Sequence, residues 1–69
     1  MEVKYPEIHV RLVGTDSNAF SIIGTVTKEL KRGGATDLDI EEFQAEATSG
    51  DYDHLLQTVM KWVTVEQDD

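Results

Sequence analysis

The 69-residue sequence contains no cysteine. This absence excludes disulfide bonds, cysteine-ligated zinc, iron–sulfur clusters and thiol catalysis. A domain of this size buries only about 60% of the surface that its unfolded chain exposes, and many small domains compensate with disulfides or metals. We therefore expect a single small domain over residues 1–69, stabilised by packing and by any self-association.

Apolar runs are also scarce. The first residues, Met1 to Pro6, lack the basic start and apolar run of a signal peptide. No stretch approaches the roughly 20 apolar residues of a membrane span. Together with the missing cysteine, these features predict a cytoplasmic protein that does not enter a membrane.

Positive charge is the third scarcity, since 6 Lys and Arg residues face 14 Asp and Glu residues and give a net charge of −8. Such a surface repels nucleic-acid phosphates and anionic membranes, so we expect no direct binding to either. The excess of acid is typical of a solubilising surface. It also suits a basic protein partner, or a chain that imitates the charge of DNA.

The N-terminal 13 residues are predicted to form a strand. The apolar residues Ile8, Val10 and Leu12 alternate with polar ones, which is the period of a half-buried strand. Pro6 has no backbone donor and therefore marks the start of the strand or an outer edge.

A first helix is predicted over residues 19–32, with one apolar stripe. Asp16 or Ser17 can accept hydrogen bonds from its first N–H groups. Its cations lie in the last turns, where the helix dipole favours them, and Gly33 and Gly34 provide a left-handed ending.

Thr36 followed by Asp39 approximates a capping box and predicts the start of a second helix. Glu, Gln and Ala favour a helix over residues 40–47. Because Phe43, Ala45 and Ala47 alternate as well, a strand stays open as the alternative.

A third helix is predicted from Tyr52. Because residues 62–65 are rich in β-formers, we expect this helix to end near Met60 and to give way to a short strand. That strand could pair with residues 8–13. Residues 66–69 are expected to form a frayed acidic tail.

These elements predict an α+β fold: an N-terminal strand, three helices and a short C-terminal strand that pairs with the first. The predicted core consists of the apolar residues that recur at strand or helix spacing: Ile8, Val10, Leu12, Ile22, Ile23, Val26, Leu30, Phe43, Leu55, Leu56, Val59 and Val63.

The turn at residues 14–18 lies between a strand and a helix, where phosphate-binding loops occur. It matches neither glycine-rich phosphate motif, and Asp16 would repel a phosphate. Asp16 and Asn18 also resemble the start of a calcium loop, but Ser21 and Thr27 stand where that loop needs Gly and Glu. A turn that caps the next helix is the favoured interpretation.

Two further groups of polar residues could bind a cation or take part in catalysis. The densest acidic cluster is Asp37, Asp39, Glu41 and Glu42, and a solvated helix start is favoured there over a weak cation site.

The tetrad at residues 51–54 is the most enzyme-like, because a histidine beside acids can act as a base. Consecutive helical residues point to different faces, however, so Asp53 is poorly placed to orient His54. We expect His54 and His9 to be surface residues. The sequence thus predicts no catalytic residue, no cofactor and no metal ligand.

Met60 and Trp62 flank the apolar stripe of the third helix. A place in the core or at its rim is the favoured interpretation for both. If they are exposed together, they are the best candidate for a partner contact, because Met and Trp are enriched at interfaces.

Two long strings, YPEIHVRLVGTDSNAFSIIGTV and AEATSGDYDHLLQTVMKWVTV, resemble a family of small, uncharacterised bacterial and phage-associated proteins. The resemblance spans Tyr5 to Val65. It implies no activity, cofactor or catalytic residue, because none is assigned to that family. By analogy alone, it favours a role in host interaction or in imitating DNA.

The leading hypothesis is a small, acidic, non-enzymatic protein-interaction module with a protein partner of basic character. An exposed edge strand leaves a homodimer open. The alternative is an acidic mimic of nucleic acid that occupies a DNA-binding protein.

Overall fold

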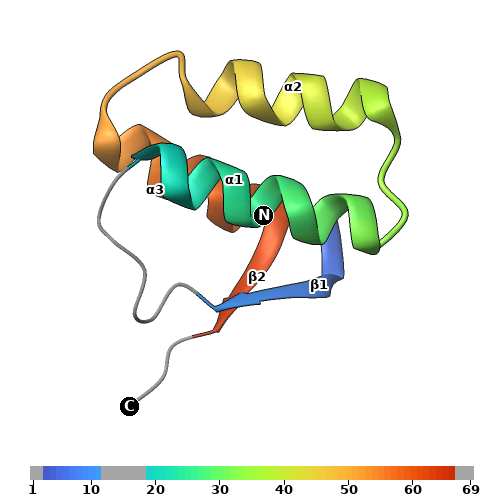
Figure 1. Ribbon diagram of the computed structural model, residues 1–69. Helices are drawn as coiled ribbons and strands as arrows, with labels where there is room; N and C mark the ends of the chain where they lie inside the picture. Colours follow the sequence, from blue (N-terminus) through green and yellow to red (C-terminus); the bar gives the residue numbers. More distant parts are fainter. Residues whose placement is uncertain (1–2, 12–18, 67–69) are drawn as a thin grey trace.

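A computed structural model describes residues 3–11 and 19–66 of the chain. Its elements are, in chain order, β1 (Tyr5–Arg11), α1 (Ala19–Arg32), α2 (Asp37–Ala47), α3 (Tyr52–Trp62) and β2 (Val63–Glu66). In the view of Figure 1 the two strands form the lower layer, and α1 and α3 lie between them and α2. This arrangement confirms the predicted α+β fold.

The two strands form a parallel sheet in which Tyr5 lies opposite Val63 and Arg11 lies opposite Glu66. The register is irregular between Tyr5 and His9. Parallel strands cannot be joined by a tight turn, and here the connection from β1 to β2 contains all three helices. The predicted pairing of the first and last elements is confirmed.

Glu66 belongs to β2, so its assignment to a frayed tail was wrong. Cross-strand side-chain contacts explain the difference, because Glu66 Oε1 lies 2.7 Å from His9 Nδ1 and Glu66 Oε2 lies 3.9 Å from Arg11 Nη2. The rest of the predicted tail, residues 67–69, lies outside the described residues.

The end of α1 follows from its paired glycines. Gly34 has a φ of +91°, the left-handed conformation that glycine adopts without steric cost. The N–H of Gly34 donates to Lys31 O at 3.2 Å, and the N–H of Ala35 donates to Leu30 O at 2.9 Å. These two bonds form a Schellman ending, which turns the chain from α1 towards α2.

Side-chain caps fix the starts of α2 and α3. Thr36 Oγ1 accepts from the N–H of Asp39 at 3.1 Å, and Asp51 Oδ1 accepts from the N–H of His54 at 2.9 Å. Residues 40–47 are therefore helical, and the strand alternative is excluded.

The third helix extends to Trp62, two residues beyond the predicted end at Met60. The N–H of Val63 still donates to Val59 O, and the Trp62 ring packs edge-on against Phe43 with centroids 5.8 Å apart. Tertiary packing thus outweighs the β-propensity of this segment.

The core joins one face of β1, the inner faces of the helices and the start of β2. Its buried apolar residues are Ile8, Val10, Ile22, Val26, Leu30, Ile40, Phe43, Ala47, Leu55, Val59, Trp62 and Val63. Nine of these were predicted, and Ile40, Ala47 and Trp62 were not in the predicted set.

Two predicted core residues, Ile23 and Leu56, pack against the core but stay half-exposed. They lie at the margins of their helical stripes, where side chains meet solvent as well as core. The prediction of full burial was wrong for both. Leu12 lies outside the described residues.

Candidate interaction site

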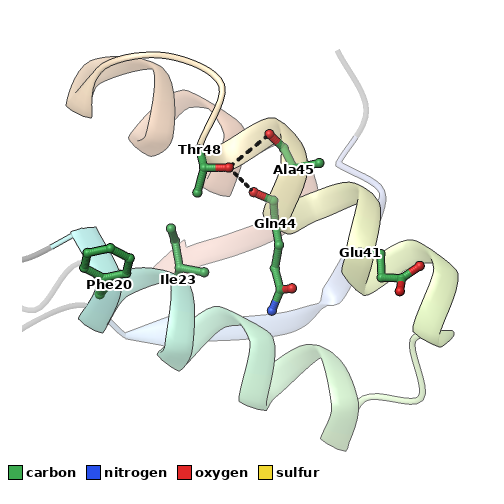
Figure 2. A pocket seen from close by; sticks show the side chains of 6 residues that line it. All are labelled: Phe20, Ile23, Glu41, Gln44, Ala45 and Thr48. Atoms are coloured by element: carbon green, nitrogen blue, oxygen red, sulfur yellow. Dashed lines mark hydrogen bonds between the residues drawn. The ribbon is translucent and has the colours of Figure 1, made fainter.

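A groove runs beside α1, next to exposed apolar side chains. Its first part, of ≈ 410 Å³, lies between α1 and α2 and is lined by Phe20, Ile23, Gln44 and Ala45 among others. Figure 2 shows Ile23 and Gln44 pointing into the space between the two helices, with Phe20 at one end and Glu41 further along α2.

A second hollow, of ≈ 250 Å³, continues from the first towards the start of α3. Phe20, Ile23 and Thr48 line both parts, and Tyr52 and Leu55 of α3 line the second. We refer to the two parts together as the Phe20 groove. Three consecutive helices thus contribute to one surface.

Phe20 is the most exposed large apolar side chain in the described part of the chain, at 81%. At 100° per residue, Phe20 lies well off the stripe of Ile22, Val26 and Leu30 that faces the core. With half-exposed Ile23 and with Tyr52, which is 41% exposed, it forms an apolar surface around the groove. Contiguous apolar surface is more informative than isolated exposed residues.

Two polar side chains of the groove walls make hydrogen bonds within the chain. Gln44 Nε2 donates to Thr27 Oγ1 at 3.1 Å and so bridges α2 and α1. Thr48 Oγ1 lies 2.8 Å from Gln44 O and 3.3 Å from Ala45 O, as the dashed lines of Figure 2 mark. The walls therefore offer a ligand mainly apolar contact.

Acidic side chains stand at the margins of the groove. Glu41 lines the part beside α2, and Asp51 lines the part beside α3, and both are exposed. The sequence of α2 contains five acids and no cation. In a chain of net charge −8, this margin favours positively charged ligands.

Met60 and Trp62, the predicted contact pair, do not share an exposed surface. Met60 is 53% exposed, whereas Trp62 is 5% exposed and stacks on Tyr5 with ring centroids 6.3 Å apart. Residues two apart on a helix point to different sides, which explains the separation. The two residues lie outside the lining of the Phe20 groove.

A cluster of polar side chains, here called the Asp39 cluster, ties the start of β1 to α2 and to the end of α3. The Tyr5 hydroxyl donates to Asp39 Oδ2. Lys4 Nζ lies 3.3 Å from Asp39 Oδ1, 3.8 Å from Glu42 Oε2 and 4.3 Å from the centre of the Trp62 ring. The cluster therefore joins hydrogen bonds, ion pairs and a cation–π contact.

The same contacts determine how the cluster titrates. The hydrogen bond from Tyr5, aided by Lys4, lowers the pKa of Asp39, and the same bond to Asp39 raises the pKa of Tyr5. Each pKa moves away from neutrality, whereas an efficient general acid or base has a pKa near the working pH. The cluster is suited to holding β1 on α2 rather than to proton transfer.

His54 is half-buried, so its prediction as an exposed residue was wrong. Its Nε2 lies 2.9 Å from Glu46 O and 3.1 Å from Ser49 Oγ. Because a carbonyl only accepts, the bond to Glu46 requires the proton on Nε2. The ring adds a bond to the Glu46 carbonyl, which also accepts from the N–H of Ser49 at 3.2 Å and from its hydroxyl at 2.7 Å, and thereby joins α2 to α3.

Other sequence candidates give no assembled site. No group of three or more His, Cys, Asp or Glu side chains within residues 3–11 and 19–66 is arranged to hold a metal ion. The turn at residues 14–18, with the capping candidates Asp16 and Ser17, lies outside the described residues. Over the same described ranges, no helix has the length and apolar character needed to span a membrane.

Comparisons of the chain with protein-family models, with curated proteins and with solved structures found no match. The resemblance based on the strings between Tyr5 and Val65 therefore stays a prediction. Sequence reasoning missed the Phe20 groove. The available signal was the position of Phe20 off the buried stripe of its helix.

Proposed function

We propose that this chain is a non-enzymatic protein-interaction module that binds a protein partner through the Phe20 groove. The observation that carries the proposal is the 81% exposure of Phe20 beside an apolar hollow. Aromatic side chains are frequent energetic centres of protein interfaces. A partner that covers this ring would remove apolar surface from water, which favours association.

The chemistry of the groove supports a binding role over a catalytic one. Thr48 lines the groove, and its hydroxyl lies within hydrogen-bond distance of two backbone carbonyls. His54 does not line the groove, and its ring is bonded to Glu46 O. Nucleophilic catalysis needs a hydroxyl beside a base. The proposal includes a cytoplasmic location, which suits a chain without cysteine.

Affinity capture with matched variants tests the proposal. A protein partner captured from native lysate by the wild-type chain should be retained by Met60→Gln and lost by Phe20→Gln. Met60 is the control because it is also an exposed apolar residue but lies outside the groove. Removing a residue that contributes more than about 1.4 kcal/mol to the binding free energy weakens binding by more than about tenfold. Equal capture by the two variants, or no specific partner, would contradict the proposal.

An acidic mimic of nucleic acid is the second candidate, suggested by the five acids of α2. It is less well supported because three of these acids contact other groups of the chain: Asp39 and Glu42 contact Lys4, and Glu46 accepts from the Trp62 indole. A partner that survives Phe20→Gln but is lost when Asp37 and Glu41 are neutralised would favour the mimic.

A further inference from the structure

We infer that the Phe20 groove takes a short amphipathic helix with lysine or arginine residues beside its apolar face. This inference rests on the proposed function and names the chemistry of the partner. Three features of the groove support this inference: its apolar walls, the hydrogen bonding of the backbone in those walls, and the acidic side chains at its margin.

The walls select an apolar side chain. Phe20 and Ile23 line both parts of the groove, and Ala45 and Leu55 line one part each. Because Gln44 Nε2 and the Thr48 hydroxyl already donate within the chain, these two side chains offer few free donors to a polar ligand. The bound face of the partner is therefore apolar.

The backbone of the walls selects a helix. The groove lies against α1, α2 and the start of α3, and Asp51 caps the first turn of α3. Apart from the lining residues between α2 and α3, Thr48, Gly50 and Asp51, the walls are helical. Helical N–H and C=O groups are bonded within their own helix, so these parts of the walls offer few backbone partners to an extended peptide. A helical ligand satisfies its own backbone, and laying an apolar helix face in a groove is a common mode of recognition.

The margin selects positive charge. Glu41 and Asp51 stand in the two parts of the groove, so a helix that crosses both meets carboxylates at each. A second copy of this chain would bring the same acids against them, at a net charge of −8 on each copy. Like charges across an interface disfavour that association, and a basic helix gains from the same field.

The test uses synthetic helical peptides as probes. Three peptides of about 15 residues share one leucine stripe and carry Lys, Gln or Glu at the flanking positions. In calorimetric titrations of the full chain at low salt, the Lys peptide should bind at least about tenfold more tightly than the Glu peptide. Phe20→Gln should weaken the Lys peptide by about tenfold or more.

Paired charge variants separate the groove from general attraction. Glu41→Gln with Asp51→Asn should weaken the Lys peptide by about three- to tenfold, and Asn keeps the cap of α3. Glu42→Gln with Asp53→Asn removes the same charge outside the groove lining and should change the affinity less than about twofold. Equal losses from the two pairs would overturn the inference.

The remaining outcomes distinguish the inference from the proposed function. If the Gln or Glu peptide binds as tightly as the Lys peptide, or if no peptide binds, the partner is not a basic helix. Capture that still depends on Phe20 would then leave the proposed function standing. If the chain forms a homodimer and Phe20→Gln dissociates it, the inference would also be overturned, because a second copy of the chain would then occupy the groove.

Discussion

Gly33 lies where the end of α1 meets β1. A Cβ at this position would come within 2.6 Å of Ile8 Cγ1, and Ile8 is buried. Gly33→Ala is therefore expected to destabilise the protein by about 1–3 kcal/mol through overpacking. Urea denaturation measures this change in the free energy of unfolding.

The matched variant is Gly24→Ala, in the middle of α1. A Cβ there would have no atom within 4 Å, and alanine forms helix more readily than glycine. We expect a gain of up to about 1 kcal/mol. Changes of the same sign in the two variants would contradict the close approach at Gly33.

The two phenylalanines differ in burial. Phe43 is fully buried and packs on Trp62, whereas Phe20 is exposed. Phe43→Ala is expected to cost about 3–5 kcal/mol, and Phe43→Leu provides a milder form of the same test if Phe43→Ala fails to fold. Phe20→Ala should cost much less, because most of its side chain is already in water. Thermal melts that show similar losses at both positions would argue against the assignment of Phe20 to a binding surface.

At the scale of elements, the Asp39 cluster couples β1 to α2, and its stability depends on pH. A hydrogen bond from Tyr5 holds the pKa of Asp39 below its ordinary value of 3.8. A carboxylate whose pKa is lowered in the folded state stabilises the fold above its unfolded pKa. That stabilisation is lost as the pH falls through the folded pKa. The wild-type chain should therefore lose this contribution below about pH 4.

Asp39→Asn tests this coupling. The variant should be less stable than the wild type near pH 7, and the difference should shrink as the pH is lowered through about 4. Asp37→Asn, in the same first turn of α2 but outside the Asp39 cluster, is the control. Trp62 fluorescence gives a local readout, because Lys4 lies 4.3 Å from the centre of its ring. A constant difference across this pH range would contradict the role of Asp39.

Local signals were enough to predict the elements. The Thr36 cap, the Gly34 ending and the alternation of Ile8 and Val10 act within a few residues, and the structure confirms each. The extent of α3 and the burial of His54 were mispredicted because they depend on contacts with α2, which lies earlier in the chain. A pattern along one helix carries no information about its neighbours.

At the scale of the molecule, the groove forms only when the three helices pack together. Its walls come from α1, α2 and α3, so no single helix contains it. Composition did predict the acidic margin in general terms, through a net charge of −8. The positions of Glu41 and Asp51 beside apolar walls became visible only with the helices in place.

The most direct test of the groove as the binding surface is a ¹⁵N-resolved NMR titration of the full chain with the Lys peptide. We predict that amide shift changes concentrate in residues 19–23, 41–48 and 51–55, while His9 and Arg11 on the exposed face of the sheet stay unchanged. Changes centred on Met60 or on that face of the sheet would contradict the account, and the absence of any saturable change would exclude a basic helix as the partner.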